Sequence, residues 1–106
     1  MAADEANEAG SRGEVPVGAV LVDSVNDEII AAAGNQTKEF TDPTAHAELL
    51  VIQQGGRRLE NTHLTGCDLY VTLEPCPMCA QAISFARIRR LYFGAYDPKG
   101  GGVEHG

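Results

Sequence analysis

Two short groups of potential metal ligands, well separated in the chain, constrain its fold more than any other feature. The first is His46-Ala47-Glu48, and the second is Pro75-Cys76-Pro77-Met78-Cys79. One imidazole and two thiolates can fill three of the four tetrahedral positions of a zinc ion and leave the fourth open to water. An open position distinguishes a catalytic zinc site from a closed structural one. The sequence therefore predicts a fold that brings His46, Cys76 and Cys79 together around one zinc ion per chain.

Glu48 supplies the carboxylate that this ligand set leaves unused. Two residues beyond His46, it could act as acid and base on water in the open position. The competing interpretation is a structural zinc site, or a redox-active Cys-x-x-Cys with an unrelated histidine. A structural site needs a fourth ligand, and the remaining thiol, Cys67, opens an apolar strand. The pattern therefore favours a catalytic site in which Glu48 is the catalytic residue.

Length and composition indicate one small domain, residues 1–106. No apolar run approaches the roughly 20 residues of a membrane span, and the N-terminus is acidic where a secretory signal is basic. The three cysteines form no disulfide framework. We therefore expect a cytoplasmic protein with no membrane partner.

The formal net charge of −7 weighs against tight binding to nucleic acid, since phosphates are bound by Lys and Arg. The charge is unevenly distributed: residues 1–48 hold ten acids and two bases, and residues 49–106 hold five acids and six bases. Arg87, Arg89 and Arg90 could hold phosphates or could simply be solvated. The distribution is compatible with a local basic rim on an acidic body.

Hydrophobic periodicity predicts alternating strands and helices. Helices are expected over residues 1–12, 45–54 (capped by Asp42-Pro43 and stopped by Gly55-Gly56) and 76–87. Strands are expected over 15–22, 28–33, 67–73 and 88–93. The first two strands form an antiparallel pair, and the last two, joined through a helix, are parallel. This order predicts a three-layer α/β fold with a mixed sheet.

Several segments of the sequence resemble those of a known family. His-x-Glu followed by Pro-Cys-x-x-Cys is shared by the zinc nucleobase deaminases. The chain beyond it resembles the bacterial tRNA-specific adenosine deaminases, which convert the wobble adenosine of an anticodon to inosine. The segments that carry this resemblance are residues 14–22, 34–35, 42–48, 69–79, 93–95 and 97–100.

The resemblance implies a cytidine-deaminase-like α/β/α sandwich, here short at its C-terminus. It also implies hydrolytic deamination of adenosine by zinc-activated water with Glu48 as the proton shuttle, an anticodon stem-loop of tRNA as substrate, and a homodimer. Three substrate contacts carry over from the family: the side chain of Asn35, the backbone N–H of Ala47, and Asp97. For Asn35 the alternative is an ordinary loop residue after Gly34, and for Asp97 a turn initiator before Pro98.

Two other functions stay open at this point. A related deaminase could act on a free base or nucleoside, such as guanine or cytosine, which the acidic charge and the short C-terminus would suit. A non-catalytic zinc-binding subunit of a heterodimeric deaminase is the third interpretation, although such subunits usually lack the glutamate that is present here as Glu48.

Overall fold

The computed structural model describes residues 2–94, which form three helices and four strands. In chain order these are α1 (Ala2–Ser11), β1 (Gly18–Asp23), β2 (Glu28–Gly34), α2 (Ala47–Leu59), β3 (Cys67–Val71), α3 (Pro77–Ala86) and β4 (Arg90–Phe93). Within this part of the chain, none of the helices has the length and apolar character needed to cross a membrane.

A mixed sheet with the strand order β2-β1-β3-β4 forms the middle layer. Strand β1 is antiparallel to both neighbours, with Ala19 opposite Ala33 of β2 and opposite Val71 of β3. Strand β4 runs parallel to β3, to which helix α3 connects it. The predicted antiparallel pair and the predicted parallel crossover are both confirmed.

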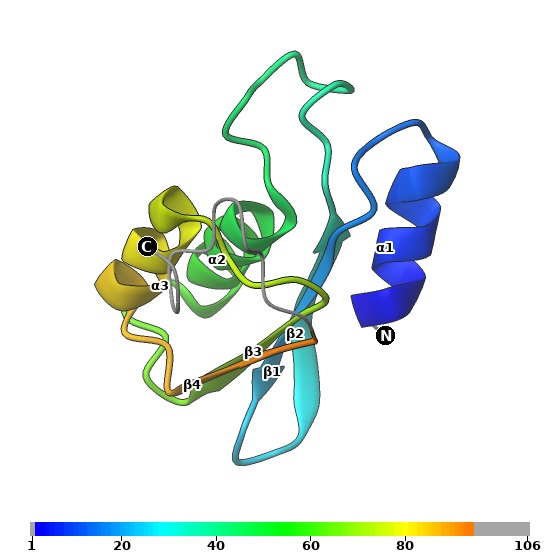
Figure 1. Ribbon diagram of the computed structural model, residues 1–106. Coiled ribbons are helices and arrows are strands. Elements are labelled where there is room, and N and C mark those ends of the chain that lie inside the picture. Colours follow the sequence, from blue (N-terminus) through cyan, green and yellow to red (C-terminus); the bar gives the residue numbers. More distant parts are fainter. Residues whose placement is uncertain (1, 95–106) are drawn as a thin grey trace.

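Helices cover both faces of this sheet (Figure 1). Helix α1 packs on β1 and β2, whereas α2 packs on the same strands from the opposite face with α3 beside it. The predicted three-layer α/β/α sandwich of the cytidine-deaminase-like type is therefore confirmed. The arrangement buries β1 on both faces, as its unbroken apolar run predicts.

Helix α2 begins later than the sequence predicts. Asp42-Pro43 does not cap it, because Asp42 Oδ1 accepts hydrogen bonds from the backbone N–H and hydroxyl of Thr44, at 2.8 and 2.6 Å, in a separate turn. The N-cap is instead His46, whose backbone is extended. The later start places a predicted metal ligand at the N-cap itself.

Helix α2 also continues through Gly55-Gly56, where the sequence predicts its end. It ends at Leu59, and Glu60 follows with a left-handed φ of 52°. Gly55 lies where α2 crosses the sheet, and a Cβ atom there would overlap the side chain of Leu21. Close packing onto the sheet thus outweighs the helix propensity of glycine, which is about 1 kcal/mol poorer than that of alanine.

Strand β1 begins at Gly18 rather than at the predicted Val15. Pro16 has no N–H to donate to a neighbouring strand, and the Val17 N–H donates locally to the Val15 carbonyl at 2.8 Å. Because β1 lies between two other strands, Pro16 marks the approach to a strand and not a sheet edge. Val15 and Val17 are thereby left on a connecting segment.

The packing of Gly55 leads to a stability prediction with an adjacent control. Gly55→Ala introduces a methyl group into the side chain of Leu21 and is expected to lower the free energy of unfolding by about 1–3 kcal/mol. At Gly56 the added Cβ would meet only Asn61 O at 3.4 Å, so Gly56→Ala is expected to be neutral or stabilising by up to about 1 kcal/mol. Urea denaturation of the two variants measures the difference, and equal midpoints would contradict the close approach of α2 to β1.

Candidate active site

The N-terminal ends of α2 and α3 bring the three predicted metal ligands together. His46 is the N-cap of α2, Cys76 is the N-cap of α3, and Cys79 lies in the first turn of α3. The Nδ1 atom of His46 is 3.7 Å from Sγ of Cys76 and 3.5 Å from Sγ of Cys79. All three donor atoms lie within 4.8 Å of one another.

These distances fit a tetrahedral zinc ion. Zinc–sulfur and zinc–nitrogen bonds of about 2.3 and 2.0–2.1 Å at the tetrahedral angle would separate the two donor atoms by about 3.6 Å. Burial raises the pKa of the Cys79 thiol, so a nearby cation is needed to stabilise its thiolate form. The donor types, their spacing and their burial therefore all suit zinc.

The cluster has no fourth protein ligand among the residues that the structure describes. Within residues 2–94, His46, Cys76 and Cys79 are the only such group of three or more candidate ligands. Cys67, the remaining thiol, is buried at the start of β3 and belongs to the hydrophobic core. The open type of site stays a prediction.

Glu48 lies beside the cluster in the first turn of α2. Its side chain is buried, and its Oε1 atom has no hydrogen-bond partner in the described part of the chain. Burial raises the pKa of Glu48, because removing a carboxylate from water disfavours the charged form. A divalent cation beside Glu48 would lower this pKa, because it favours the charged carboxylate. An unpartnered buried oxygen has a high energetic cost, which a functional partner such as water or substrate would relieve.

A cavity of about 240 Å³ opens onto the cluster and Glu48. It is smaller than the pockets of about 300–1,000 Å³ that hold drug-sized ligands, and so suits a single heterocyclic base. The residues that line it are Val15, Val17, Asn35, Thr37, His46, Glu48, Leu73, Glu74 and Cys76. Apolar walls with a few convergent polar groups are typical of small-molecule sites.

Two of the three predicted substrate contacts are bonded to each other. The backbone N–H of Ala47 donates to Oδ1 of Asn35 at 2.8 Å, and both residues are buried. This bond fixes the amide orientation of Asn35, so that the group it can offer to the cavity is its Nδ2 donor. Asp97, the third predicted contact, lies outside the described residues. The substrate roles of all three residues stay predictions.

Sequence reasoning missed the walls of the cavity. Val15 and Val17 are predicted as part of a strand, and Thr37 receives no role in the sequence-based interpretation. All three line the cavity. Val15 and Val17 come just before β1, and Thr37 comes just after β2, so they lie at the same open end of the β1–β2 hairpin. Pro16 was the available signal, since it interrupts the strand pattern where the cavity wall begins.

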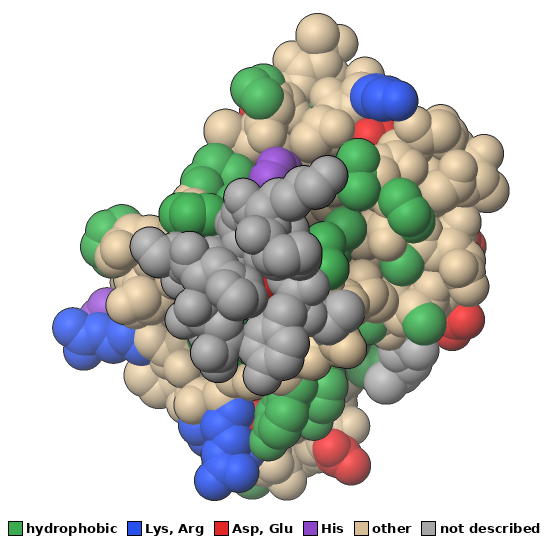
Figure 2. Space-filling view, viewed as in Figure 1, with side chains coloured by type: hydrophobic (Ala, Val, Ile, Leu, Met, Phe, Trp, Pro, Cys, Tyr) green, Lys and Arg blue, Asp and Glu red, His purple; other side chains and the backbone are tan. Residues whose placement is uncertain are grey.

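Among the described residues, the basic side chains visible in Figure 2 lie in separate groups. Arg89 is engaged by Asp68, whose two oxygens accept hydrogen bonds from its guanidinium at 2.9 and 2.8 Å. Arg87 has a left-handed φ of 57° and caps the C-terminal end of α3. Arg89 therefore has a structural partner that the sequence does not reveal.

An α/β/α sandwich with a His/Cys/Cys cluster, no fourth ligand among the described residues and a buried adjacent glutamate is typical of a zinc-dependent deaminase. Residues 1–95 match the family described as the cytidine and deoxycytidylate deaminase zinc-binding region. The match covers nearly the whole chain. This chain belongs to that family, and its His46, Cys76 and Cys79 are positioned to bind a metal ion.

Within the family, the chain belongs with the tRNA-specific adenosine deaminases. It is 60% identical over 106 residues to the tRNA-specific adenosine deaminase of Agrobacterium fabrum, an alignment that covers the whole chain and 68% of that protein. A solved structure from a study of A-to-I editing by tRNA:A34 deaminases at the wobble position of transfer RNA superposes with a TM-score of 0.95 at 60% identity, over the whole chain and 75% of that structure.

The fold is also close to that of a deaminase of a free base. The X-ray structure of guanine deaminase from Bacillus subtilis superposes with a TM-score of 0.84 at 38% identity, and the match covers 90% of this chain and 60% of that one. This similarity keeps the predicted alternative of a free-base substrate open to experiment.

The ligand assignment predicts the zinc content of three variants. His46→Ala and Cys79→Ala each remove one of three donors and are expected to reduce bound zinc from one ion per chain to near zero after dialysis. Cys67→Ala serves as the control, because this thiol lies in the core away from the cluster, and it is expected to keep its zinc. Elemental analysis of the purified proteins measures both. Zinc retained by Cys79→Ala, or lost from Cys67→Ala, would contradict the assignment.

Proposed function

We propose that this chain catalyses the hydrolytic deamination of adenosine to inosine at the wobble position of tRNA. The observation that carries the proposal is the buried, unpartnered Oε1 of Glu48 beside the His46, Cys76 and Cys79 cluster, in a cavity of the size of one base. The 60% identity to a tRNA-specific adenosine deaminase supports adenosine in tRNA as the substrate.

Glu48 is the proposed catalytic residue. When bound by its three ligands, zinc supplies a water molecule acidified from its bulk pKa to near 7. Glu48 accepts a proton from the attacking water and delivers it to the ring nitrogen next to C6 of the base. The water oxygen bonds to C6. Glu48 then takes the second proton from the hydroxyl now on C6 and transfers it to the exocyclic amino group, so that the bond between C6 and this amino group breaks and ammonia leaves. The sum is water plus adenosine to inosine plus ammonia.

The cavity walls orient the base for this reaction. Val15, Val17 and Leu73 provide apolar surface against which a flipped-out base can pack. Asn35 is proposed to donate from Nδ2 to an acceptor nitrogen of the ring, while its Oδ1 keeps the bond to Ala47. The proposed role of the Ala47 backbone is therefore to hold Asn35, or to contact the base after Asn35 has moved.

The larger assembly is proposed from the relatives and from the surface. We propose that residues 1–106 act as one deaminase domain, that two chains form a homodimer, and that the anticodon stem-loop is bound with the help of Asp97. Phe85 is 72% exposed near the C-terminal end of α3 and is suited to an interface between chains. A cytoplasmic location, where tRNA is modified, goes with this function.

A second candidate function is deamination of a free purine base. The 38% identity and shared fold with guanine deaminase from Bacillus subtilis favour it, as does the net charge of −7, which opposes binding to a polyanion. A non-catalytic subunit is less consistent with the site, since Glu48 is present and buried against the cluster.

Replacing Glu48 tests the mechanism. Glu48→Gln keeps the size of the side chain but cannot accept and return a proton, and it is expected to lower kcat by about 10²–10⁴-fold. Zinc content is expected to stay at the wild-type value, because Glu48 is not one of the three ligands. Steady-state ammonia release and elemental analysis measure the two effects. Wild-type turnover in Glu48→Gln would eliminate the assignment.

The choice of substrate is tested by comparing ammonia release from an anticodon stem-loop that carries a wobble adenosine with release from free guanine and from cytosine. We expect turnover of the stem-loop alone. If only a free base is turned over, the second candidate replaces the first, because the same site then acts without RNA.

A further inference from the structure

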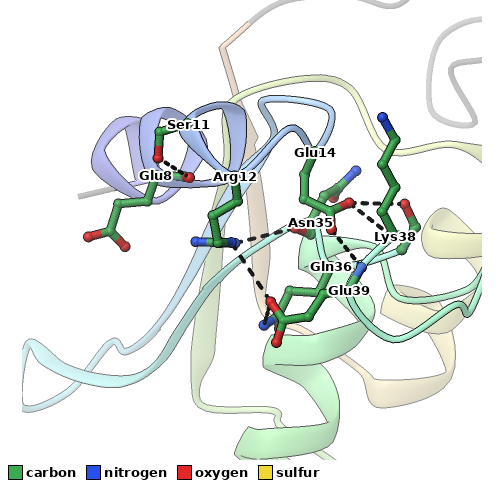
Figure 3. Close-up of polar contacts among 9 residues, drawn as sticks. Glu8, Ser11, Arg12, Glu14, Asn35, Gln36, Lys38 and Glu39 are labelled. Atoms are coloured by element: carbon green, nitrogen blue, oxygen red, sulfur yellow. Dashed lines mark hydrogen bonds and ion pairs between the residues drawn. The ribbon is translucent and has the colours of Figure 1, made fainter.

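Glu14 is a buried acid that the proposed reaction does not use. It lies on the connection between α1 and β1 and is only 6% exposed. A buried carboxylate has a high energetic cost unless it is hydrogen-bonded, and Glu14 accepts three hydrogen bonds, all from one segment of the chain (Figure 3). The role of Glu14 is therefore to be sought in the role of this segment, residues 37–39.

All three donors belong to consecutive residues of the loop that follows β2. Oε1 of Glu14 accepts from the backbone N–H of Lys38 at 3.0 Å and from the hydroxyl of Thr37 at 3.2 Å, and Oε2 accepts from the backbone N–H of Glu39 at 2.8 Å. The Lys38 N–H is the main cause of a lowered pKa at Glu14. The carboxylate is therefore charged at neutral pH, and its bonds are charge-assisted.

These bonds join two segments that line the cavity. Val15, next to Glu14, belongs to the connection between α1 and β1, whereas Asn35 and Thr37 belong to the segment that follows β2. Other contacts run in parallel: Lys38 Nζ donates to the Gly13 carbonyl at 2.8 Å, the backbone N–H of Asn35 donates to the Val17 carbonyl at 3.0 Å, and Arg12 donates to the Asn35 carbonyl at 3.4 Å. Among these contacts, the Glu14 carboxylate is the acceptor that binds two backbone N–H groups of the loop directly.

We propose that Glu14 is a positioning residue for the substrate: its carboxylate fixes residues 37–39 against the segment that carries Val15, and so holds Thr37 in the cavity wall where it contacts the bound base. This inference rests on the proposed function. Glu14 lines neither the cavity nor the metal cluster, and its effect is on substrate binding rather than on the proton transfers of Glu48.

Glu14→Gln removes the charge at nearly constant volume. Its amide has one acceptor oxygen, and its NH₂ group would face a backbone N–H that now binds a carboxylate oxygen. The matched control is Asp68→Asn. Asp68 is also 6% exposed and accepts two hydrogen bonds, but from Arg89, and it lines no part of the cavity.

Kinetics separate positioning from general destabilisation. For the anticodon stem-loop, Glu14→Gln is expected to raise KM about tenfold and to change kcat less than about threefold, with zinc content unchanged. Glu14→Asp keeps both acceptor oxygens on a shorter side chain and is expected to recover part of the KM. Asp68→Asn is expected to leave KM at the wild-type value. An unchanged KM in Glu14→Gln, or an equal rise in Asp68→Asn, would overturn the proposal.

Hydrogen exchange tests the same inference without any activity. In the zinc-loaded protein, the amides of Lys38 and Glu39 are expected to exchange at least about tenfold faster in Glu14→Gln than in wild type, while Asp68→Asn leaves them unchanged. If Glu14→Gln does not fold, Glu14→Asp carries both measurements. Thr37→Val, which removes one donor but also alters the cavity wall, carries the exchange measurement alone. Unchanged exchange at both amides would overturn the role of Glu14. If the wild-type protein does not deaminate the stem-loop, the proposed function fails, and the exchange result still decides that role.

Discussion

The meeting of two helix N-termini at one point is the constraint on which the rest of this structure depends. His46 and Cys76 are the N-caps of α2 and α3, the residues just before each helix begins. Their side chains lie close to that of Cys79 in the first turn of α3. The sheet fixes this meeting, since Gly55 lets α2 pack closely onto β1 while the parallel pair β3–β4 sets the position of α3. Three donors thus reach zinc-binding distances without a fourth from the described residues.

Around this point, buried polar groups are either bonded or available for chemistry. Asn35 is fixed by the Ala47 N–H, and Glu14 is satisfied by three donors from the following loop. Glu48 is the exception, with a buried oxygen that lacks a partner in the described part of the chain. An unpaired buried oxygen beside a satisfied acid and a satisfied amide is available to a substrate, to water or to a proton in transfer, as the proposed role of Glu48 requires.

The sequence predicts the chemistry of this site better than the details of its surroundings. His46, Cys76 and Cys79 could be identified because zinc demands particular donors, and the strand pattern could be read because burial on both faces leaves an apolar run. The start and end of α2 could not be predicted in this way. Its start depends on a local turn at Asp42, and its continuation through Gly55 depends on the close approach to Leu21. Nor could the cavity walls or the bonds of Glu14, which join residues distant in sequence.

The most direct test of this account is X-ray absorption at the zinc edge of the purified, zinc-loaded protein. The account predicts two sulfur ligands at about 2.3 Å and two nitrogen or oxygen ligands at about 2.0–2.1 Å, one of which exchanges with solvent. A third sulfur ligand, which would require Cys67, or a fourth ligand from the protein would contradict it, because the position needed for the attacking water would then be closed.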